Sequence, residues 1–155
     1  MSTTRFADAV AALIAAYQAA LAGVPVYDGA QPTSASDPEF LIVGHDATIA
    51  ADGTLEATAL AGIFTQNWAD YTSPREETGS INCLLVAQTG DPGDVAGRRA
   101  RVALLLAAAE DATLAASAPH LTFDGTTDGR WLTRQGQAGV AVMCTWRVAY
   151  SAPWG

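Results

Sequence analysis

The stretch from Glu76 to Ser117 decides the fold. It contains Ile81-Asn-Cys-Leu-Leu-Val-Ala-Gln88, a short apolar run bounded by Gly79 and Gly90. Such a run is typical of a buried strand. After it, apolar residues recur at helical spacing, which predicts an amphipathic helix: Val95, Val102, Leu105, Leu106, Ala109 and Ala112. A buried strand followed by such a helix is a scaffold, and no catalytic group is built onto it.

The residues before this helix predict where it starts. Asp91 is a suitable N-cap, and proline is tolerated at the first helical position, here Pro92, because its missing N–H needs no partner there. Asp94 in the first turn favours the positive end of the helix dipole.

A second helix is predicted near the start of the chain. Thr3 or Thr4 can cap it, and Gly23 and Pro25 end it. Its apolar residues lie on one face: Phe6, Val10, Leu13, Ile14, Tyr17 and Leu21.

The stretch between the two helices is expected to form strands. Val24–Tyr27 is a short extended segment, and Phe40–Val43 is a buried strand. Leu55–Trp68 is predicted to be a longer strand. The segment from Asp70 to Gly79 connects it to the Ile81 strand, which gives an antiparallel hairpin with a long tip.

Beyond the second helix, the spacing predicts three extended segments. His120–Phe123 and Arg130–Arg134 are separated by expected turns at Asp124-Gly125 and Asp128-Gly129. Val140–Tyr150 alternates with a period of two and has one strongly apolar face.

This order predicts an α+β fold with a mainly antiparallel sheet and two long helices packed on one face. The 155 residues are expected to form a single domain, residues 1–155, and half of them are hydrophobic. Both faces of the central strand are apolar: Ile81, Cys83 and Leu85 on one, Leu84 and Val86 on the other. Two helices do not easily cover both faces, so a neighbouring chain is a candidate to cover the rest.

The formal net charge is −8, and all eight basic residues are arginine. An acidic chain is a poor candidate for wrapping DNA, because phosphate binding needs clustered positive charge. It suits the lining of a channel through which DNA slides. The cluster Arg98, Arg99 and Arg101 is therefore read as a solvated face or an interface patch rather than a nucleic-acid site.

The sequence offers no catalytic, cofactor or metal site. Cys83 and Cys144 lie in apolar, strand-like runs and are read as buried thiols rather than a disulfide. His45 and His120 lack the spacing of metal ligands, and no glycine loop carries the lysine that a phosphate site needs. No secretory signal and no membrane span are expected.

The segment from Asp70 to Gly79 is the candidate surface for contacts with other chains, because long loops on a rigid sheet often carry binding surfaces. The candidate assembly contacts are Tyr71, Arg75, Glu76 and Glu77. The two adjacent glutamates should point to opposite faces of a strand, so they are not an acid–base pair. A solvated rim is the expected environment for both. A mobile tip without a function is the alternative for the loop.

The pattern Glu76-Glu77-x-Gly-x-Ile81-x-Cys83-x-x-x-Ala87-x-x-Gly90-Asp91, followed by an Arg/Ala-rich helix, resembles the tail terminator (tail completion) proteins of long-tailed bacteriophages. The opening amphipathic helix is similar too. Two further features are similar to that family. One is Val24-Pro-Val-Tyr27-Asp-Gly leading into Phe40-Leu-Ile-Val-Gly44, and the other is Gln135-Gly136 before the strand through Val148.

The resemblance implies a structural virion protein with a compact α+β fold and no catalytic residues. Such a protein forms a homohexameric ring that caps the tail tube, stops its polymerisation and joins the tail to the head. The implied partners are other copies of the chain, the major tail tube protein and the head-closure or connector protein. Genome DNA would pass through the lumen without specific binding. Assembly would occur in the host cytoplasm, and the protein would reside in the virion. Another neck protein, or a small α+β ligand-binding domain or enzyme, is the alternative.

Overall fold

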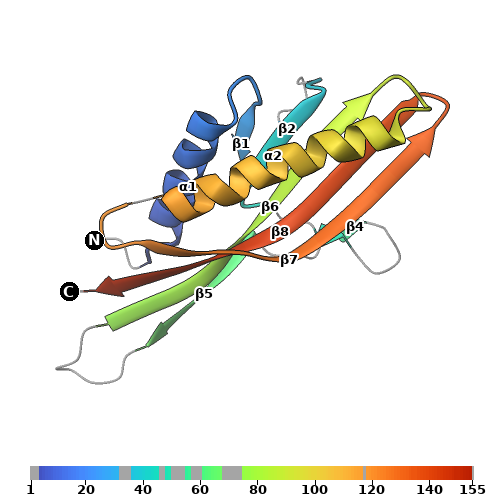
Figure 1. Ribbon diagram of the computed structural model, residues 1–155. Coiled ribbons are helices and arrows are strands. Elements are labelled where there is room, and N and C mark those ends of the chain that lie inside the picture. The colour runs from blue at the N-terminus through green and yellow to red at the C-terminus, as the bar shows by residue number, and fades with distance from the viewer. Residues whose placement is uncertain are drawn as a thin grey trace.

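A computed structural model describes residues 4–31, 36–45, 48–49, 55–56, 61–67, 75–116 and 118–154 (Figure 1). The two helices are α1 (Phe6–Ala20) and α2 (Val95–Ala115). The strands, in chain order, are β1 (Val26–Asp28), β2 (Glu39–Val43), β3 (Thr48–Ile49), β4 (Leu55–Glu56), β5 (Gly62–Asn67), β6 (Arg75–Thr89), β7 (Thr122–Gly136) and β8 (Gly139–Trp154).

Strand β6 is the centre of a six-stranded sheet with the order β1-β2-β6-β8-β7, in which β5 also pairs with β6. One edge of β6 pairs with β5 through its first half and with β2 through its second half. The other edge pairs with β8 along its whole length. The predicted buried strand from Ile81 to Gln88 is therefore confirmed as part of β6, which begins earlier, at Arg75.

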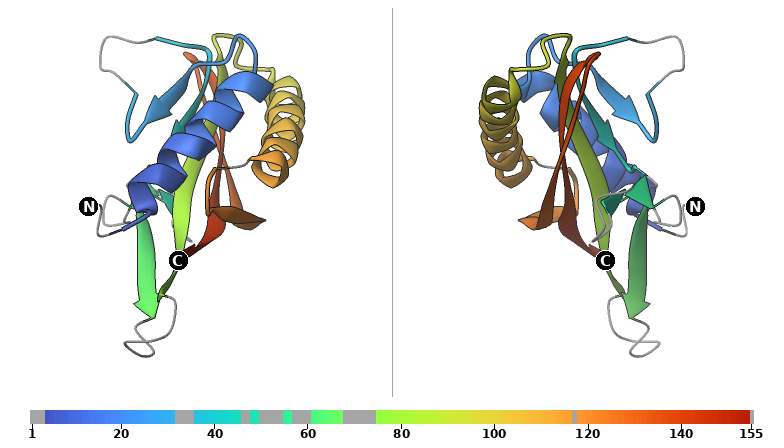
Figure 2. Two further views of the ribbon diagram at one scale, coloured as in Figure 1. Left: turned by 90° about the vertical axis from the view of Figure 1, so that its left-hand side faces the viewer. Right: turned by 90° about the vertical axis from the view of Figure 1, so that its right-hand side faces the viewer.

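The predicted mainly antiparallel fold class is wrong, because the sheet is mixed. β1 pairs with β2 in parallel, with Val26 opposite Leu41, whereas the other pairings in the large sheet are antiparallel. A pattern of apolar residues predicts a strand but does not show whether that strand pairs in parallel or antiparallel with its neighbour. Both helices do lie on the same face of the sheet (Figures 1 and 2).

Three further predictions of local structure are wrong. Leu55–Trp68 is not one strand: of the described residues in this stretch, Leu55–Glu56 pairs with β3 in a separate two-stranded sheet, whereas Gly62–Asn67 joins the large sheet. The two expected turns around Gly125 and Asp128 are irregularities inside the continuous strand β7. Gly125 (φ 103°) and Asp128 (φ 55°) adopt the left-handed backbone that turns and β-bulges share, so the sequence signal is the same for both.

The helix starts also differ from the prediction. α2 begins at Val95 with Asp94 at the N-cap position, so Pro92 precedes it. The Asp91 carboxylate instead accepts a hydrogen bond from the Gly93 amide at 2.9 Å, which closes a local turn. In α1, Arg5 occupies the N-cap position, although the Thr4 hydroxyl accepts a hydrogen bond from the amide of Phe6 at 3.1 Å.

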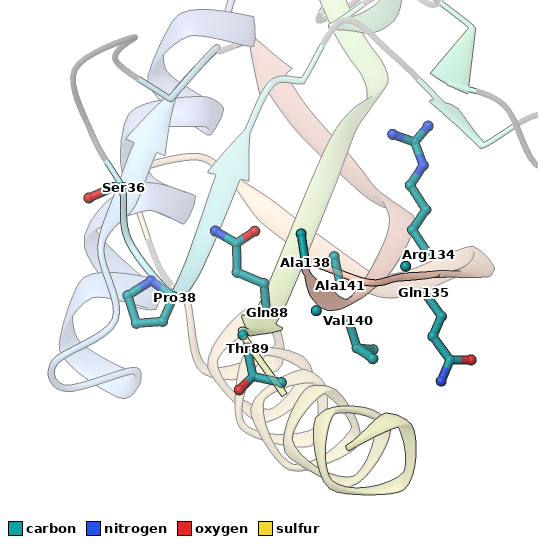
Figure 3. Close-up of a pocket in the computed structure, with 12 residues that line it drawn as sticks. Ser36, Pro38, Gln88, Thr89, Arg134, Gln135, Ala138, Val140 and Ala141 are labelled. Atoms are coloured by element: carbon teal, nitrogen blue, oxygen red, sulfur yellow. The ribbon is translucent and has the colours of Figure 1, made fainter. Parts of the chain in front are cut away.

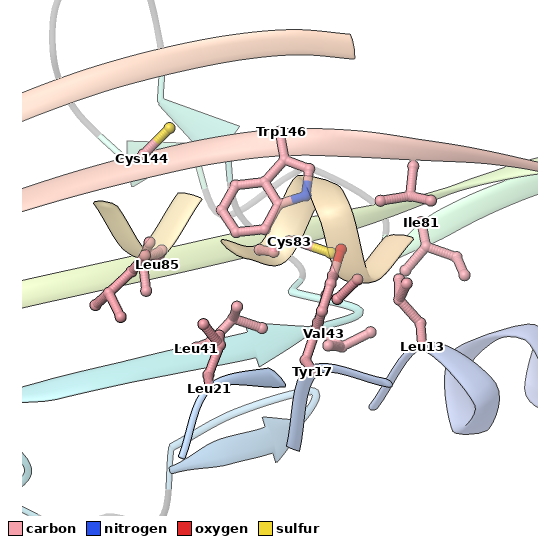
Figure 4. Packing of buried hydrophobic residues seen from close by; sticks show 14 of the residues in the cluster. Leu13, Tyr17, Leu21, Leu41, Val43, Ile81, Cys83, Leu85, Cys144 and Trp146 are labelled. Atoms are coloured by element: carbon pink, nitrogen blue, oxygen red, sulfur yellow. The ribbon is translucent and has the colours of Figure 1, made fainter. Parts of the chain in front are cut away.

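Two apolar layers lie on opposite faces of the sheet. The larger packs α1 and α2 against the face that contains Ile81, Cys83 and Leu85 (Figure 4). The smaller lies on the second face and comprises Phe40, Ile42, Leu84, Val86 and Met143. The predicted division of the β6 side chains between two apolar faces is confirmed.

Candidate assembly surface

The sequence-predicted contact residues do not form one surface. Tyr71 lies outside the described residues, and Arg75 is described only as the first residue of β6, paired with Trp154. Glu76 is exposed, whereas Glu77 is completely buried. The two glutamates point to opposite faces, as predicted. The expected loop from Asp70 to Gly79 is wrong over its second half, where residues 75–79 belong to β6.

The solvated rim expected for Glu77 is also wrong, because its carboxylate is the centre of a buried hydrogen-bond network. Oε1 accepts from the Thr4 hydroxyl at 2.9 Å, the Arg5 amide at 3.0 Å and the Tyr150 hydroxyl at 2.8 Å. Oε2 accepts from the Gln66 side-chain amide at 2.8 Å. Sequence reasoning missed this role because the donors come from three segments that are distant from Glu77 in the chain.

The network favours the ionised carboxylate. Burial by itself raises the pKa of Glu77, but the hydrogen bonds from Gln66, Tyr150, Thr4 and Arg5 outweigh that effect, and the net pKa lies below its ordinary value. Burial and the neighbouring Glu77 both raise the pKa of Tyr150, which therefore remains a neutral donor. Glu77 thus joins the start of α1 to β5 and β8, and its role is structural.

The network lies at the root of an arm, which we define as β5 with the first half of β6 and the end of β8. Figures 1 and 2 show this arm extending beyond the helices. Two glycines make room for aromatic rings at its root: a Cβ on Gly62 would overlap the Phe6 ring, and one on Gly79 would meet the Tyr150 ring at 2.6 Å. The Phe6 and Tyr150 rings lie 6.4 Å apart between centroids.

The arm exposes two large apolar side chains on β5. Ile63 is 55% exposed and Phe64 is 48% exposed, and they point to opposite faces. β5 pairs with β6 on one side, and among the described strands no other pairs with it. The sequence gave no sign that this strand pairs on one side alone among the described strands.

A second exposed apolar surface lies on α2. Leu104 is 62% exposed and Leu114 is 70% exposed. They share the outer face of the helix with exposed alanines: Ala96, Ala100, Ala103 and Ala107. The sequence analysis assigned the buried stripe of this helix correctly but did not identify its exposed apolar face. That face could have been recognised from the apolar residues that lie outside the buried stripe.

The arginines of α2 have different environments. Arg98 pairs with Asp94 at 3.3 Å, and Arg101 forms a bidentate pair with Glu39 on β2 at 2.5 and 3.2 Å. Arg99 is exposed and forms no ion pair with any residue that the structure describes. The predicted cluster is therefore divided: Arg98 pairs with the N-cap residue of α2, Arg101 joins α2 to the sheet, and Arg99 is a solvated cation.

A groove with a volume of about 620 Å³ lies where the β7–β8 hairpin meets the end of β6 (Figure 3). Gln88 and Arg134 border it, together with backbone near Gly139. The side chain of Gln88 donates to the carbonyl of Asp37 at 2.9 Å, and Gln135 donates to the carbonyl of Pro92 at 2.6 Å. The described residues that line the groove include no thiol, imidazole or carboxylate.

The cysteines and histidines form no reactive centre in the described part of the chain. Cys83 and Cys144 are buried and free, as predicted. Burial raises the pKa of both thiols, that of Cys144 to about 11, so neither is a ready nucleophile. No group of three potential metal ligands occurs within the described ranges. No helix in those ranges has the length and apolar character needed to cross a membrane.

Comparison with known proteins finds no family model and no curated protein that matches this chain. The arm and the outer face of α2 are therefore interpreted from their own chemistry.

Proposed function

We propose that the protein is a structural subunit of a phage tail, which forms a ring at the end of the tail tube, stops tube growth and joins the tail to the head. The observation that carries the proposal is the pair of exposed apolar surfaces, one on the β5 arm and one on α2. Contiguous exposed apolar patches are typical of interaction sites, and on α2 the exposed Leu104 adjoins exposed alanines such as Ala100 and Ala107. The sequence resemblance to tail terminators supplies the identity of the assembly.

The charge of the chain agrees with this proposal. Each copy contributes −8, so a ring multiplies a negative potential around its lumen. Such a lumen repels phosphate and lets DNA pass without binding. The like charge also opposes association of the copies, so apolar contacts are needed to hold the ring together.

Removal of the protein from the virus that encodes it tests this function. A nonsense mutation in its gene is expected to give tails of uncontrolled length that are not joined to heads, and supply of the protein in trans should restore normal virions. Electron microscopy of the lysate measures both features. Tails of normal length that remain unjoined would favour the alternative role as a connector. Normal joined virions would contradict the proposal.

A further inference from the structure

We propose that the groove between the end of β6 and the β7–β8 hairpin binds an extended, acidic peptide segment of a partner protein, with a carboxylate of that segment on Arg134. The groove lies at the opposite end of β6 from the arm. Binding of the peptide is a property beyond the proposed function, because it requires neither a ring nor a tail tube.

One row of residues across three strands forms the floor of the groove. Gln88 on β6 and Arg134 on β7 both lie opposite Ala141 on β8. Cross-strand partners share a face of the sheet, so these three side chains lie on the face of Met143, opposite the helices. Figure 3 shows Gln88 and Arg134 directed to the same side. The small side chain of Ala141 between two long side chains leaves the depression.

The next row towards the end of the sheet consists of glycines. Gly136 lies opposite Gly139, and a Cβ on Gly139 would lie 3.0 Å from the Cα of Gly90. Gly139 is required by the fold, because its φ is 140° and an added Cβ would overlap the Thr89 carbonyl oxygen. Gly90 and Gly136 have no positive φ, and a Cβ on either would meet nothing within 4 Å. Close approach of a ligand to the backbone accounts for glycine at these two positions.

The walls of the groove are fixed within the subunit. On one side, the Gln88 side chain donates to the Asp37 carbonyl at 2.9 Å and holds the segment before β2. On the other side, the Gln135 side chain donates to the Pro92 carbonyl at 2.6 Å and ties the hairpin to the turn before α2. The volume of about 620 Å³ is that of a typical ligand site. Because the walls are already ordered, binding costs little conformational entropy of the protein.

The charge in the groove selects a carboxylate. Arg134 carries the only charge among the described residues that line the groove. It is exposed and forms no ion pair with any residue that the structure describes. Arg130, four residues earlier on β7, lies opposite Thr145 and adds a second cation to the same face. A guanidinium binds a carboxylate through two parallel hydrogen bonds, which makes an acidic side chain the matching ligand group.

The carboxylates nearest to the groove in sequence are engaged elsewhere. Asp37 accepts from the Tyr27 hydroxyl, Glu39 pairs with Arg101, and Asp91 accepts from an amide of the turn before α2. None of these carboxylates lines the groove. Asp37 precedes β2, which lies three strand spacings, roughly 14 Å, from β7. Charges are screened over about 8 Å at physiological salt, so the guanidinium in the groove outweighs the more distant negative charge of the chain.

The shape of the groove favours an extended peptide over a small anion. Its lining runs from Ser36, before β2, to Arg134 on β7, across roughly 14 Å of sheet. An extended peptide rises about 3.3 Å per residue, so about four residues span this distance. The glycine row leaves room for their backbone close to the sheet. A small free carboxylate would occupy only the end of the groove at Arg134.

An array of immobilised random heptapeptides tests the ligand class. Each sequence is present twice, with Glu or with Gln at its centre, and is probed with the labelled protein. We expect a subset of the Glu peptides to bind about tenfold more tightly than their Gln partners. Arg134→Gln should abolish this preference, whereas Arg99→Gln on α2 makes the same change in net charge and should keep it. No binding to the array, equal binding of the two sets, or a preference that survives Arg134→Gln would overturn the proposal.

A second experiment tests the glycine row with the tightest Glu peptide of the array. The double variant Gly90→Ala/Gly136→Ala should keep the wild-type melting temperature and bind this peptide about fivefold more weakly. The matched control Gly129→Ala lies on β7 outside the groove, where a Cβ also meets nothing within 4 Å, and should bind normally. Unchanged affinity of the double variant would contradict the placement of the peptide.

Competition with glutarate separates a peptide from a small carboxylate ligand. We expect glutarate to displace the peptide only at concentrations about a hundredfold above the Kd of the peptide. Displacement at concentrations near that Kd would identify a small-carboxylate site and overturn the peptide assignment. None of these binding results bears on the ring function, which the nonsense mutation tests separately.

Discussion

Replacement of Glu77 by alanine is expected to lower the free energy of unfolding by about 3–5 kcal/mol, because it removes the buried acceptor that four donors share, among them the buried Tyr150 hydroxyl. The Thr4 and Tyr150 hydroxyls and the Arg5 amide lose their shared partner, Oε1. Chemical denaturation monitored by circular dichroism measures the change. The matched control Tyr150→Phe removes one donor and leaves the carboxylate, so it should cost about 1–2 kcal/mol. Equal losses in the two variants would contradict a central role for Glu77.

Because the Glu77 carboxylate is ionised, the free energy of unfolding should depend on pH. The pKa of Glu77 is lower in the folded state than its ordinary value, which is about 4.3 in an unfolded chain. The stabilisation of the folded state by the Glu77 carboxylate is therefore fully present above the unfolded-state pKa, and it is lost as the pH falls through the folded-state pKa. The difference in free energy of unfolding between the wild type and Glu77→Gln should become smaller as the pH decreases below about 4. A gap that stays constant from neutral to acid pH would show that the ionised carboxylate is not the stabilising form.

Replacement of Gly79 by alanine is the second change with a large expected effect. An added Cβ would lie 2.5 Å from the Ile63 carbonyl oxygen and 2.6 Å from the Tyr150 ring. The backbone of β5 cannot yield without loss of its pairing, and the ring cannot move without breaking its bond to Glu77. We expect a destabilisation of about 2–4 kcal/mol, by overpacking together with loss of the network.

Gly90 provides the matched control for this substitution. It follows the other end of β6, and a Cβ there meets nothing within 4 Å. Gly90→Ala should change the melting temperature little, whereas Gly79→Ala should lower it clearly. Similar melting temperatures for both variants would contradict the close packing at the root of the arm.

Periodicity alone predicted the elements that build the core. The apolar run around Leu85 was read as a buried strand, and the spacing of Val102, Leu105 and Ala109 predicted the buried face of α2. Both patterns are local and repeat over many residues, and the apolar residues that form each pattern are the ones that pack together in the core. The alternation from Val140 to Tyr150 predicted β8 for the same reason.

Features that depend on distant segments were not predictable in this way. Strand direction at β1 depends on the path of the following loop, and bulges in β7 carry the same Asp-Gly signal as turns. The environment of Glu77 depends on donors more than 70 positions away, such as Tyr150. The exposure of Ile63 depends on which strands lie beside β5. The candidate assembly contacts were therefore placed on the loop, whereas the exposed large apolar residues of the arm, Ile63 and Phe64, lie on β5.

The proposed function is tested most directly by electron cryomicroscopy of phage tails assembled with this protein. We expect six copies in a closed ring on the last layer of the tube, around a lumen that is neutral to acidic. A single non-symmetric copy, or a tail end without this protein, would contradict the proposed function.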